Sequence, residues 1–176
     1  DRCVANGISL TLNRGDRIAL VGRNGCGKSS LLKLLIGQPI SHTGTLEIGS
    51  RLTVSYVPQD MSFLSGSADD FAAESEIDIT LFKTILRKLD FKRTQFTKDM
   101  SEFSMGQKKK VLLARSLCQR ANLYIWDEPL NYIDVISRLQ IETLILEYKP
   151  TMLFVEHDEA FVNDIATKVC RISLNQ

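Results

Sequence analysis

Short apolar runs alternate with amphipathic stretches along this chain of 176 residues. Apolar residues that recur every three or four positions predict helices, and short runs of apolar and β-branched residues predict strands. Strands are expected at residues 8–12, 17–21, 45–48, 53–57, 123–126, 152–155 and 169–172, and helices at 30–36, 81–89, 107–120, 135–148 and 159–165. Because helices separate most of these strands, the pattern favours an α/β fold with a mostly parallel sheet.

Two stretches interrupt this alternation. Residues 62–75 are small, acidic and aperiodic, which predicts a mobile surface loop. Residues 77–120 lack strand signals, so we expect a single domain, residues 1–176, with a helical subdomain at about 77–120. That segment holds eleven basic and four acidic residues, a net charge of +7 in a chain whose total is +1. It could bind nucleic acid phosphates, and a solvated helical face is the alternative interpretation.

Composition and cysteine spacing narrow the class of protein. A hydrophobic content of 44% and a charged content of 24% are ordinary for a globular protein. No apolar run reaches the roughly 18 residues that a membrane span needs, and no signal peptide opens the chain. We therefore expect no direct membrane insertion. The four cysteines are scattered without a C-x-x-C pair, which favours reduced thiols in a cytoplasmic protein over a disulfide scaffold or zinc site.

A glycine-rich segment follows the expected strand at residues 17–21. It reads GRNGCGKS and matches the phosphate-binding pattern G-x-x-x-x-G-K-[ST]. Glycines let the backbone approach phosphate oxygens, and the loop N–H groups and the positive helix end point at the anion. Lys28 is expected to bridge the β- and γ-phosphates of a nucleoside triphosphate, and the Ser29 hydroxyl to bind Mg²⁺. The expected nucleotide-binding residues are Gly22, Arg23, Asn24, Gly25, Cys26, Gly27, Lys28, Ser29 and Ser30.

Cys26 lies within this segment, two residues before Lys28. A thiol beside a lysine at a helix start is in an environment typical of reactive cysteines. We therefore expect alkylation of Cys26 to block ATP binding. The alternative is that Cys26 is a small residue that fills space.

Two acidic residues, Asp127 and Glu128, end the apolar strand expected at residues 123–126. Ligands of parallel α/β sheets bind beyond the carboxyl ends of the strands. If this strand lies beside the strand at 17–21, both acids lie next to the phosphate loop. Asp127 is then expected to hold Mg²⁺, directly or through water, and Glu128 to polarise the attacking water.

The order of motifs along the chain resembles that of an ABC-type ATPase domain. The resemblance covers nearly the whole chain and implies a P-loop fold with a mostly parallel sheet, an antiparallel β portion and a helical subdomain. The matching segments are the Walker A loop at 22–29, Gln59 of the Q-loop, the signature segment at 104–107, the Walker B strand at 123–127 with Glu128, the D-loop at 130–134 and His157 of the switch.

The resemblance also implies a role for each motif. Gln59 would contact Mg²⁺ or the attacking water, and His157 would donate to the γ-phosphate. The signature segment of one domain completes the ATP site of another. Ser104, Gly106 and Gln107 are thus expected to contact ATP held by a second ABC ATPase domain, on the same parent chain or in a homodimer. The isolated chain is then expected to hydrolyse ATP weakly.

The segments 103–110 and 126–134 resemble the antibiotic-resistance branch of the ABC-F class, and the chain is most similar to the second of two ATPase domains there. This implies a fragment of a longer chain that acts on the ribosome, with the basic segment facing ribosomal RNA. The main alternative is the ATP-binding subunit of a membrane ABC transporter. A chromosome-maintenance ATPase would need a long heptad insertion, which this sequence lacks. Glu128 argues against a non-catalytic ATP-gated module.

Two features depart from the family pattern. Met105 stands where the signature usually has glycine, which adds bulk near the other domain's ATP. The aromatic residue that stacks on adenine has no clear counterpart in this sequence.

Overall fold

The computed structural model describes residues 7–173, which divide into two compact units. The first unit comprises residues up to Tyr56, Ala121–Glu128 and the chain from Lys149 onward. The second comprises Val57–Arg120 and Pro129–Tyr148.

A five-stranded sheet forms the centre of the first unit, with β2 ending at the boundary. Its strands lie in the order β2-β3-β4-β1-β5. The pairs β1–β4, β1–β5 and β3–β4 are parallel. Phe154 of β4 lies between Ala19 of β1 and Trp126 of β3. The strands are β1 (Arg17–Val21), β2 (Val54–Val57), β3 (Leu123–Asp127), β4 (Met152–Val155) and β5 (Lys168–Arg171). The expected parallel α/β fold is therefore confirmed.

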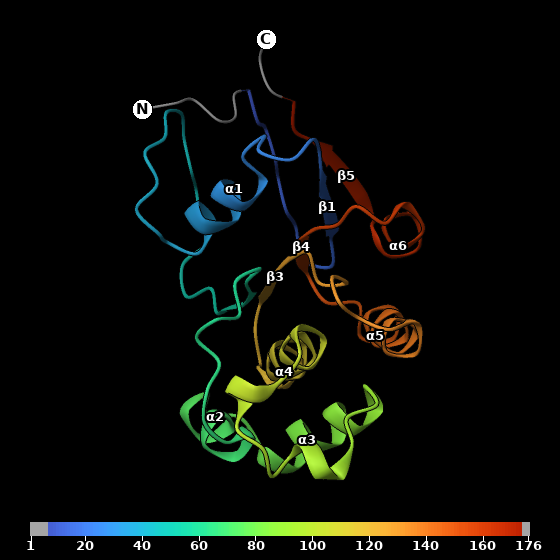
Figure 1. The fold of residues 1–176 in the computed structure, drawn as a ribbon. Helices are drawn as coiled ribbons and strands as arrows, with labels where there is room; N and C mark the ends of the chain where they lie inside the picture. The colour runs from blue at the N-terminus through green and yellow to red at the C-terminus, as the bar shows by residue number, and fades with distance from the viewer. Residues whose placement is uncertain (1–6, 174–176) are drawn as a thin grey trace. The chain divides into compact units, whose positions relative to one another are not determined.

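Two helices of the first unit, α1 (Lys28–Leu35) and α6 (Glu159–Ile165), lie on opposite sides of the sheet (Figure 1). Two buried residues from each of β1, β3 and β4 form one apolar cluster with Leu32 of α1: Ile18, Leu20, Leu123, Ile125, Leu153 and Val155. Asp158 starts α6 by accepting a hydrogen bond from the Phe161 N–H at 2.9 Å. These contacts hold the loops that follow β1, β3 and β4 at the carboxyl edge of the sheet.

The second unit is helical. The helices α2 (Ala68–Glu74) and α4 (Met105–Cys118) both pack against α3 (Ile79–Lys88), and α5 (Val135–Tyr148) belongs to the same unit. The single-turn helices η1 (Arg93–Gln95) and η2 (Met100–Glu102) connect α3 to α4. This unit is wider than the 77–120 subdomain expected from the sequence, because it begins at Val57 and includes α5.

Two expected strands are absent from the described residues. Residues 8–12 and 45–48 form no strand, so these segments do not supply the expected antiparallel β portion. Ile8, Leu10 and Leu12 nevertheless pack against the apolar cluster of the first unit. At residues 8–12 the alternation thus marks the side that packs on the core, whereas Leu46 and Ile48 of the other segment are exposed. A strand also needs a backbone partner.

The loop expected at residues 62–75 is also wrong in part, because Ala68–Glu74 is a helix. Ser67 caps this helix by accepting a hydrogen bond from the Asp70 N–H at 3.0 Å, and Asp69 and Asp70 lie in the first turn. A serine followed by acidic residues in the first turn is a typical helix start. The small, acidic composition of the segment concealed it.

Candidate nucleotide-binding site

The phosphate loop joins β1 to α1, and its first glycine is required by packing. A Cβ atom on Gly22 would lie 2.4 Å from the Ile172 carbonyl oxygen and 2.8 Å from Sγ of Cys26. Gly27 caps α1 with φ at +93°, a left-handed conformation that side chains disfavour. The backbone therefore requires two glycines of the GxxxxGK pattern for different reasons: Gly22 because a side chain would collide with Ile172, and Gly27 because its φ is positive.

Lys28, the first residue of α1, is buried although it is charged. Its Nζ donates to the carbonyl oxygens of Gly22 and Arg23, at 2.8 and 3.0 Å. The ammonium group is thus held over the loop by two backbone acceptors. A phosphate oxygen, which carries negative charge, would be a stronger acceptor for the same group.

Asp127 and Glu128 lie at the carboxyl end of β3, as the sequence predicts. Asp127 is only 1% exposed, and Glu128 adopts a left-handed backbone with φ at +51°. The Glu128 N–H donates to the Val155 carbonyl at 3.0 Å, which ties the turn to the end of β4. Burial and the negative charge of Asp127 raise the pKa of Tyr56 to about 12. Strained backbone of this kind clusters at functional sites.

His157 follows β4 and lies close to Glu128. Its Nε2 atom is 3.6 Å from Oε1 of Glu128, and the His157 side chain is half exposed. Because β4 lies between β3 and β1, the assumption that β3 neighbours β1 is wrong. The loops after β1, β3 and β4 still share one edge of the sheet, and that edge brings together the phosphate loop, the acidic pair and His157.

Glu156 is a site residue that the sequence reasoning missed. It is 4% exposed, and its Oε1 accepts a hydrogen bond from the His157 N–H at 2.7 Å. The carboxylate therefore fixes the backbone turn that presents His157. An acidic residue directly after the apolar β4 run was the available signal.

The residues at this edge suit an ATP-bound Mg²⁺ ion. No group of three or more His, Cys, Asp or Glu side chains that could hold a metal occurs within residues 7–173. Mg²⁺ bound with a nucleotide needs only one or two protein ligands, because phosphate oxygens and water complete its shell. The Ser29 hydroxyl and the buried Asp127 carboxylate are hard oxygen donors of that kind.

The remaining expected site residues lie in the second unit. Gln59 follows β2, and Ser104 and Gln107 form a reciprocal cap at the start of α4. The Gln107 N–H donates to Ser104 Oγ at 3.3 Å, and the Ser104 N–H donates to Gln107 Oε1 at 2.9 Å. Met105 is exposed. The contacts of these residues with ATP remain predictions.

The expected reactivity of Cys26 is contradicted by its burial. The residue is 1% exposed and belongs to the apolar cluster of the first unit. Its sulfur would meet a Cβ on Gly22 at 2.8 Å, so it faces the base of the loop. The alternative of a small, space-filling residue fits the structure.

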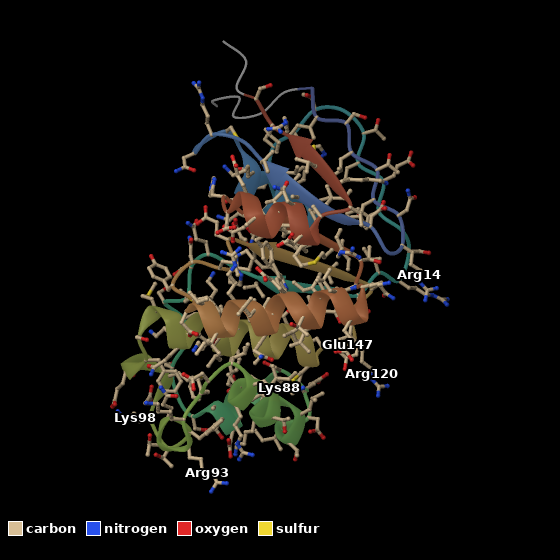
Figure 2. The ribbon with its side chains drawn as sticks, turned by 90° about the vertical axis from the view of Figure 1, so that its right-hand side faces the viewer. Arg14, Lys88, Arg93, Lys98, Arg120 and Glu147 are labelled. Carbon is tan, nitrogen blue, oxygen red and sulfur yellow. The ribbon has the colours of Figure 1, made fainter. Side chains whose placement is uncertain are left out.

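The basic segment at 77–120 is divided between solvent and interior. Lys109 and Lys110 are buried, so they cannot face RNA. The exposed cations are Arg87, Lys88, Lys92, Arg93, Lys98 and Arg120. Figure 2 shows Arg93, Lys98 and Arg120 projecting outward.

Comparison with known proteins agrees with this geometry. A sequence model of the ABC transporter family matches residues 5–131. The chain is 37% identical over 173 residues to the ATP-binding protein YdiF of Bacillus subtilis, covering 94% of the chain and 26% of that relative. It is 30% identical over 178 residues to ABC transporter F family member 2 of Arabidopsis thaliana, covering 98% of the chain and 26% of that protein.

Solved structures give the same result. A complex of the archaeal ribosomal stalk protein aP1 with the archaeal ribosome recycling factor aABCE1 matches with a TM-score of 0.76 and 26% identity, covering 93% of this chain and 33% of that chain. The ATP-binding subunit of an ABC transporter matches in fold with a TM-score of 0.82 at 20% identity, covering 97% of this chain and 82% of that one.

The chain belongs to the ABC transporter family, as an ATPase domain with a P-loop fold. Its relatives are ATP-binding proteins of the ABC-F type, and ATP hydrolysis is the activity characteristic of such domains. The chain spans about a quarter of the length of YdiF. Within residues 7–173, no helix combines the length and apolar character needed to cross a bilayer.

Proposed function

We propose that this domain binds Mg-ATP in its first unit and hydrolyses it when a second ABC ATPase domain packs head to tail against it. The observation that carries the proposal is the 3.6 Å approach of His157 Nε2 to Glu128 Oε1. The two residues follow neighbouring parallel strands, and β1, which precedes the phosphate loop, lies next to β4. A base, a polar donor and a phosphate cradle on one sheet edge suit phosphoryl transfer to water.

The binding half of the proposal uses the phosphate loop. Lys28 Nζ would exchange its bonds to the Gly22 and Arg23 carbonyls for oxygens of the β- and γ-phosphates. Ser29 and Asp127 would hold Mg²⁺, which neutralises charge on the phosphates when bound. Gln59 is proposed to contact the metal or the attacking water.

The chemical half uses Glu128 and His157. Glu128 would accept a proton from water as the water attacks the γ-phosphorus and ADP leaves with the bridging oxygen. His157 would donate a hydrogen bond to the transferred phosphate. Ser104, Gly106 and Gln107 would contact the ATP of the partner domain. Since positioning and charge stabilisation account for most of the catalysis, a domain without its partner should turn over slowly.

The test is Glu128→Gln in the full protein that carries this domain. Loss of the base should lower turnover about a hundredfold or more while nucleotide affinity stays unchanged. Phosphate release and equilibrium ATP binding measure the two quantities. Glu147→Gln, an exposed position on α5, is the matched control (Figure 2). Unchanged turnover in Glu128→Gln would remove Glu128 from the mechanism.

Dependence on a second domain is tested separately. Turnover per molecule of the isolated domain should rise with protein concentration. Concentration-independent turnover as fast as that of the whole protein would refute the need for a partner.

We further propose that the parent protein is a cytoplasmic factor of ABC-F type that acts on the ribosome, within the antibiotic-resistance branch. Support comes from the ABC-F relatives and from the similarity to the recycling factor aABCE1. The exposed cations Lys88, Arg93 and Lys98 would then bind ribosomal RNA phosphates.

Ribosome binding by the full protein should weaken steeply as salt rises. The double variant Arg93→Glu/Lys98→Glu should weaken binding and flatten that dependence. The control is Arg14→Glu, a charge reversal at an exposed residue of the first unit (Figure 2). Salt-insensitive binding, or equal effects of both changes, would exclude this role for the cations. Stable co-purification with a polytopic membrane protein would favour the transporter alternative.

A further inference from the structure

Helix α4 carries three consecutive lysines, and two of them point into the second unit. Lys109 is 1% exposed and Lys110 is 8% exposed. Lysine is almost never buried without a partner, because removing an ammonium group from water is costly. A solvated basic run does not explain the burial of Lys109 and Lys110, so their contacts within the unit must.

Lys109 is directed at the segment that carries Gln59. Its Nζ donates to the Pro58 carbonyl oxygen at 3.2 Å. Pro58 directly precedes Gln59, so this bond ties the backbone of the Q-loop to the middle of α4.

Lys110 is directed at the D-loop. Its Nζ lies 2.6 Å from Oδ2 of Asp134. Asp134 also accepts from the Ser137 N–H at 2.9 Å, at the start of α5. Burial would raise the pKa of Asp134, but the hydrogen bonds from Lys110 and Ser137 and the charge of Lys110 lower it to about 2. Asp134 is therefore a carboxylate at neutral pH and a true ionic partner for Lys110.

Gly106 shows how closely the D-loop lies on α4. A Cβ atom at this position would be 2.5 Å from the Tyr132 carbonyl oxygen. Tyr132 itself is 65% exposed and adopts φ at +67°. The D-loop thus lies against the first turn of α4, and the Lys110–Asp134 ion pair joins its last residue to the same helix.

We propose that Lys109 and Lys110 are positioning residues that hold the Q-loop and the D-loop on the signature helix, so that the three motifs of the second unit act as one body. The inference rests on the proposed function, because positioning of these motifs matters only if they serve ATP hydrolysis. The phosphate cradle belongs to the first unit, so loss of either lysine should lower kcat and leave KM for ATP unchanged.

The experiment measures kcat and KM for ATP in the full protein with Lys109→Met, Lys110→Met and Lys110→Arg. Each methionine variant should lower kcat about tenfold, and arginine, which keeps the charge and reach, should restore most of it. Lys83→Met is the matched control, because it removes another ion pair of the same unit, Lys83–Asp69 at 2.7 Å, without touching either loop. Urea unfolding of each variant verifies that the fold is intact.

Asp134→Asn completes a double-mutant cycle, since asparagine keeps the helix cap but loses the charge. If Lys110 acts through Asp134, the double variant Lys110→Met/Asp134→Asn should lose no more activity than either single variant. Additive losses would overturn the pairing. Equal losses in Lys83→Met would overturn the positioning role, as would normal kcat in folded Lys110→Met.

Failure of the proposed function has a different signature. If Lys28→Ala kept the full ATPase activity, the activity measured would not come from this site, whatever the lysine variants did. If turnover is lost in Lys28→Ala but unchanged in Lys109→Met and Lys110→Met, the proposed function stands and only the positioning role is rejected.

Discussion

Each unit places a glycine against a backbone carbonyl, but the two carbonyls are held differently. In the first unit, a Cβ on Gly22 would meet the Ile172 oxygen at 2.4 Å, and in the second a Cβ on Gly106 would meet the Tyr132 oxygen at 2.5 Å. Ile172 is buried, and its N–H donates to the Val21 carbonyl at 2.8 Å, which extends the pairing of β1 and β5. Tyr132 is exposed in a loop whose end is joined to α4 by Lys110 and Asp134.

This difference indicates how each unit positions its functional groups. Backbone pairing in a sheet holds the strands that precede the phosphate loop, the acidic pair and His157, and the Glu156 carboxylate adds one side-chain contact at the His157 turn. In the second unit, charged side chains add to the packing of the loops, because Lys109 bonds to Pro58 and Lys110 pairs with Asp134. Substitutions in the first unit should therefore remove chemistry, whereas substitutions in the second should disturb geometry.

The largest effect that tests this contrast is on nucleotide binding. Lys28→Ala should weaken ATP affinity about ten- to a hundredfold, because a charge-assisted contact is lost, with the fold retained. Titration with a fluorescent ATP analogue measures the affinity. Lys33→Ala, an exposed lysine on the same helix, should change nothing. Equal affinity of Lys28→Ala and wild type would refute the site.

The next effect is on stability. Gly22→Ala should destabilise the protein by about 1–3 kcal/mol, because the new methyl group collides with backbone that is held in the sheet. Gly49→Ala is the control, since nothing lies within 4 Å of a Cβ there and its φ is not positive. It should shift the free energy of unfolding by less than about 0.5 kcal/mol. Equal urea midpoints for the two variants would show that Gly22 is not packed as described.

A smaller effect concerns pH and the second unit. The pKa of Asp134 is lowered from 3.8 to about 2, so the ionised group stabilises the fold above pH 4, and that contribution is lost as pH falls towards 2. The gap in unfolding free energy between wild type and Asp134→Asn should be below about 1 kcal/mol, because the side chain is half exposed.

That gap should shrink as pH falls from 4 to 2, and it should also shrink at neutral pH in a Lys110→Met background. Denaturant unfolding across the pH series measures it. If the difference in unfolding free energy between wild type and Asp134→Asn grew on acidification, it would contradict a lowered pKa of Asp134.

The smallest expected effect is chemical modification. Cys26 is buried, and burial raises the pKa of Cys118 to about 11, with Asp78 adding to the shift. Burial also raises the pKa of Cys170. Iodoacetamide at pH 7.5 should therefore label these three thiols slowly in the native protein and rapidly in urea. Mass spectrometry of peptides assigns the labelled sites, and rapid native labelling of Cys26 would contradict its burial.

Local patterns in the sequence predicted most of the fold. The helix at 135–148, the strand at 152–155 and the helix at 159–165 agree with the structure at both ends. Their signals are strong because capping residues, apolar period and length all point to the same element. The phosphate loop was equally clear, because its glycines and its lysine lie within one short segment and form a recognisable pattern there.

Other features depend on partners far away in the chain. The segment 8–12 has the alternation of a strand but forms none among residues 7–173. No local signal predicts that β4 lies between β1 and β3. Glu156 is recognisable only once its carboxylate is seen to accept the His157 N–H.

The lysines of α4 show which properties the sequence determines and which depend on the tertiary structure. Composition determined that residues 77–120 are basic, and motif spacing determined that α4 begins with the signature segment. Only the tertiary structure decided that Lys109 and Lys110 turn inward to Pro58 and Asp134 while Arg93 and Lys98 face solvent. A charged side chain is buried only where another part of the chain supplies an acceptor, and that acceptor is found by folding.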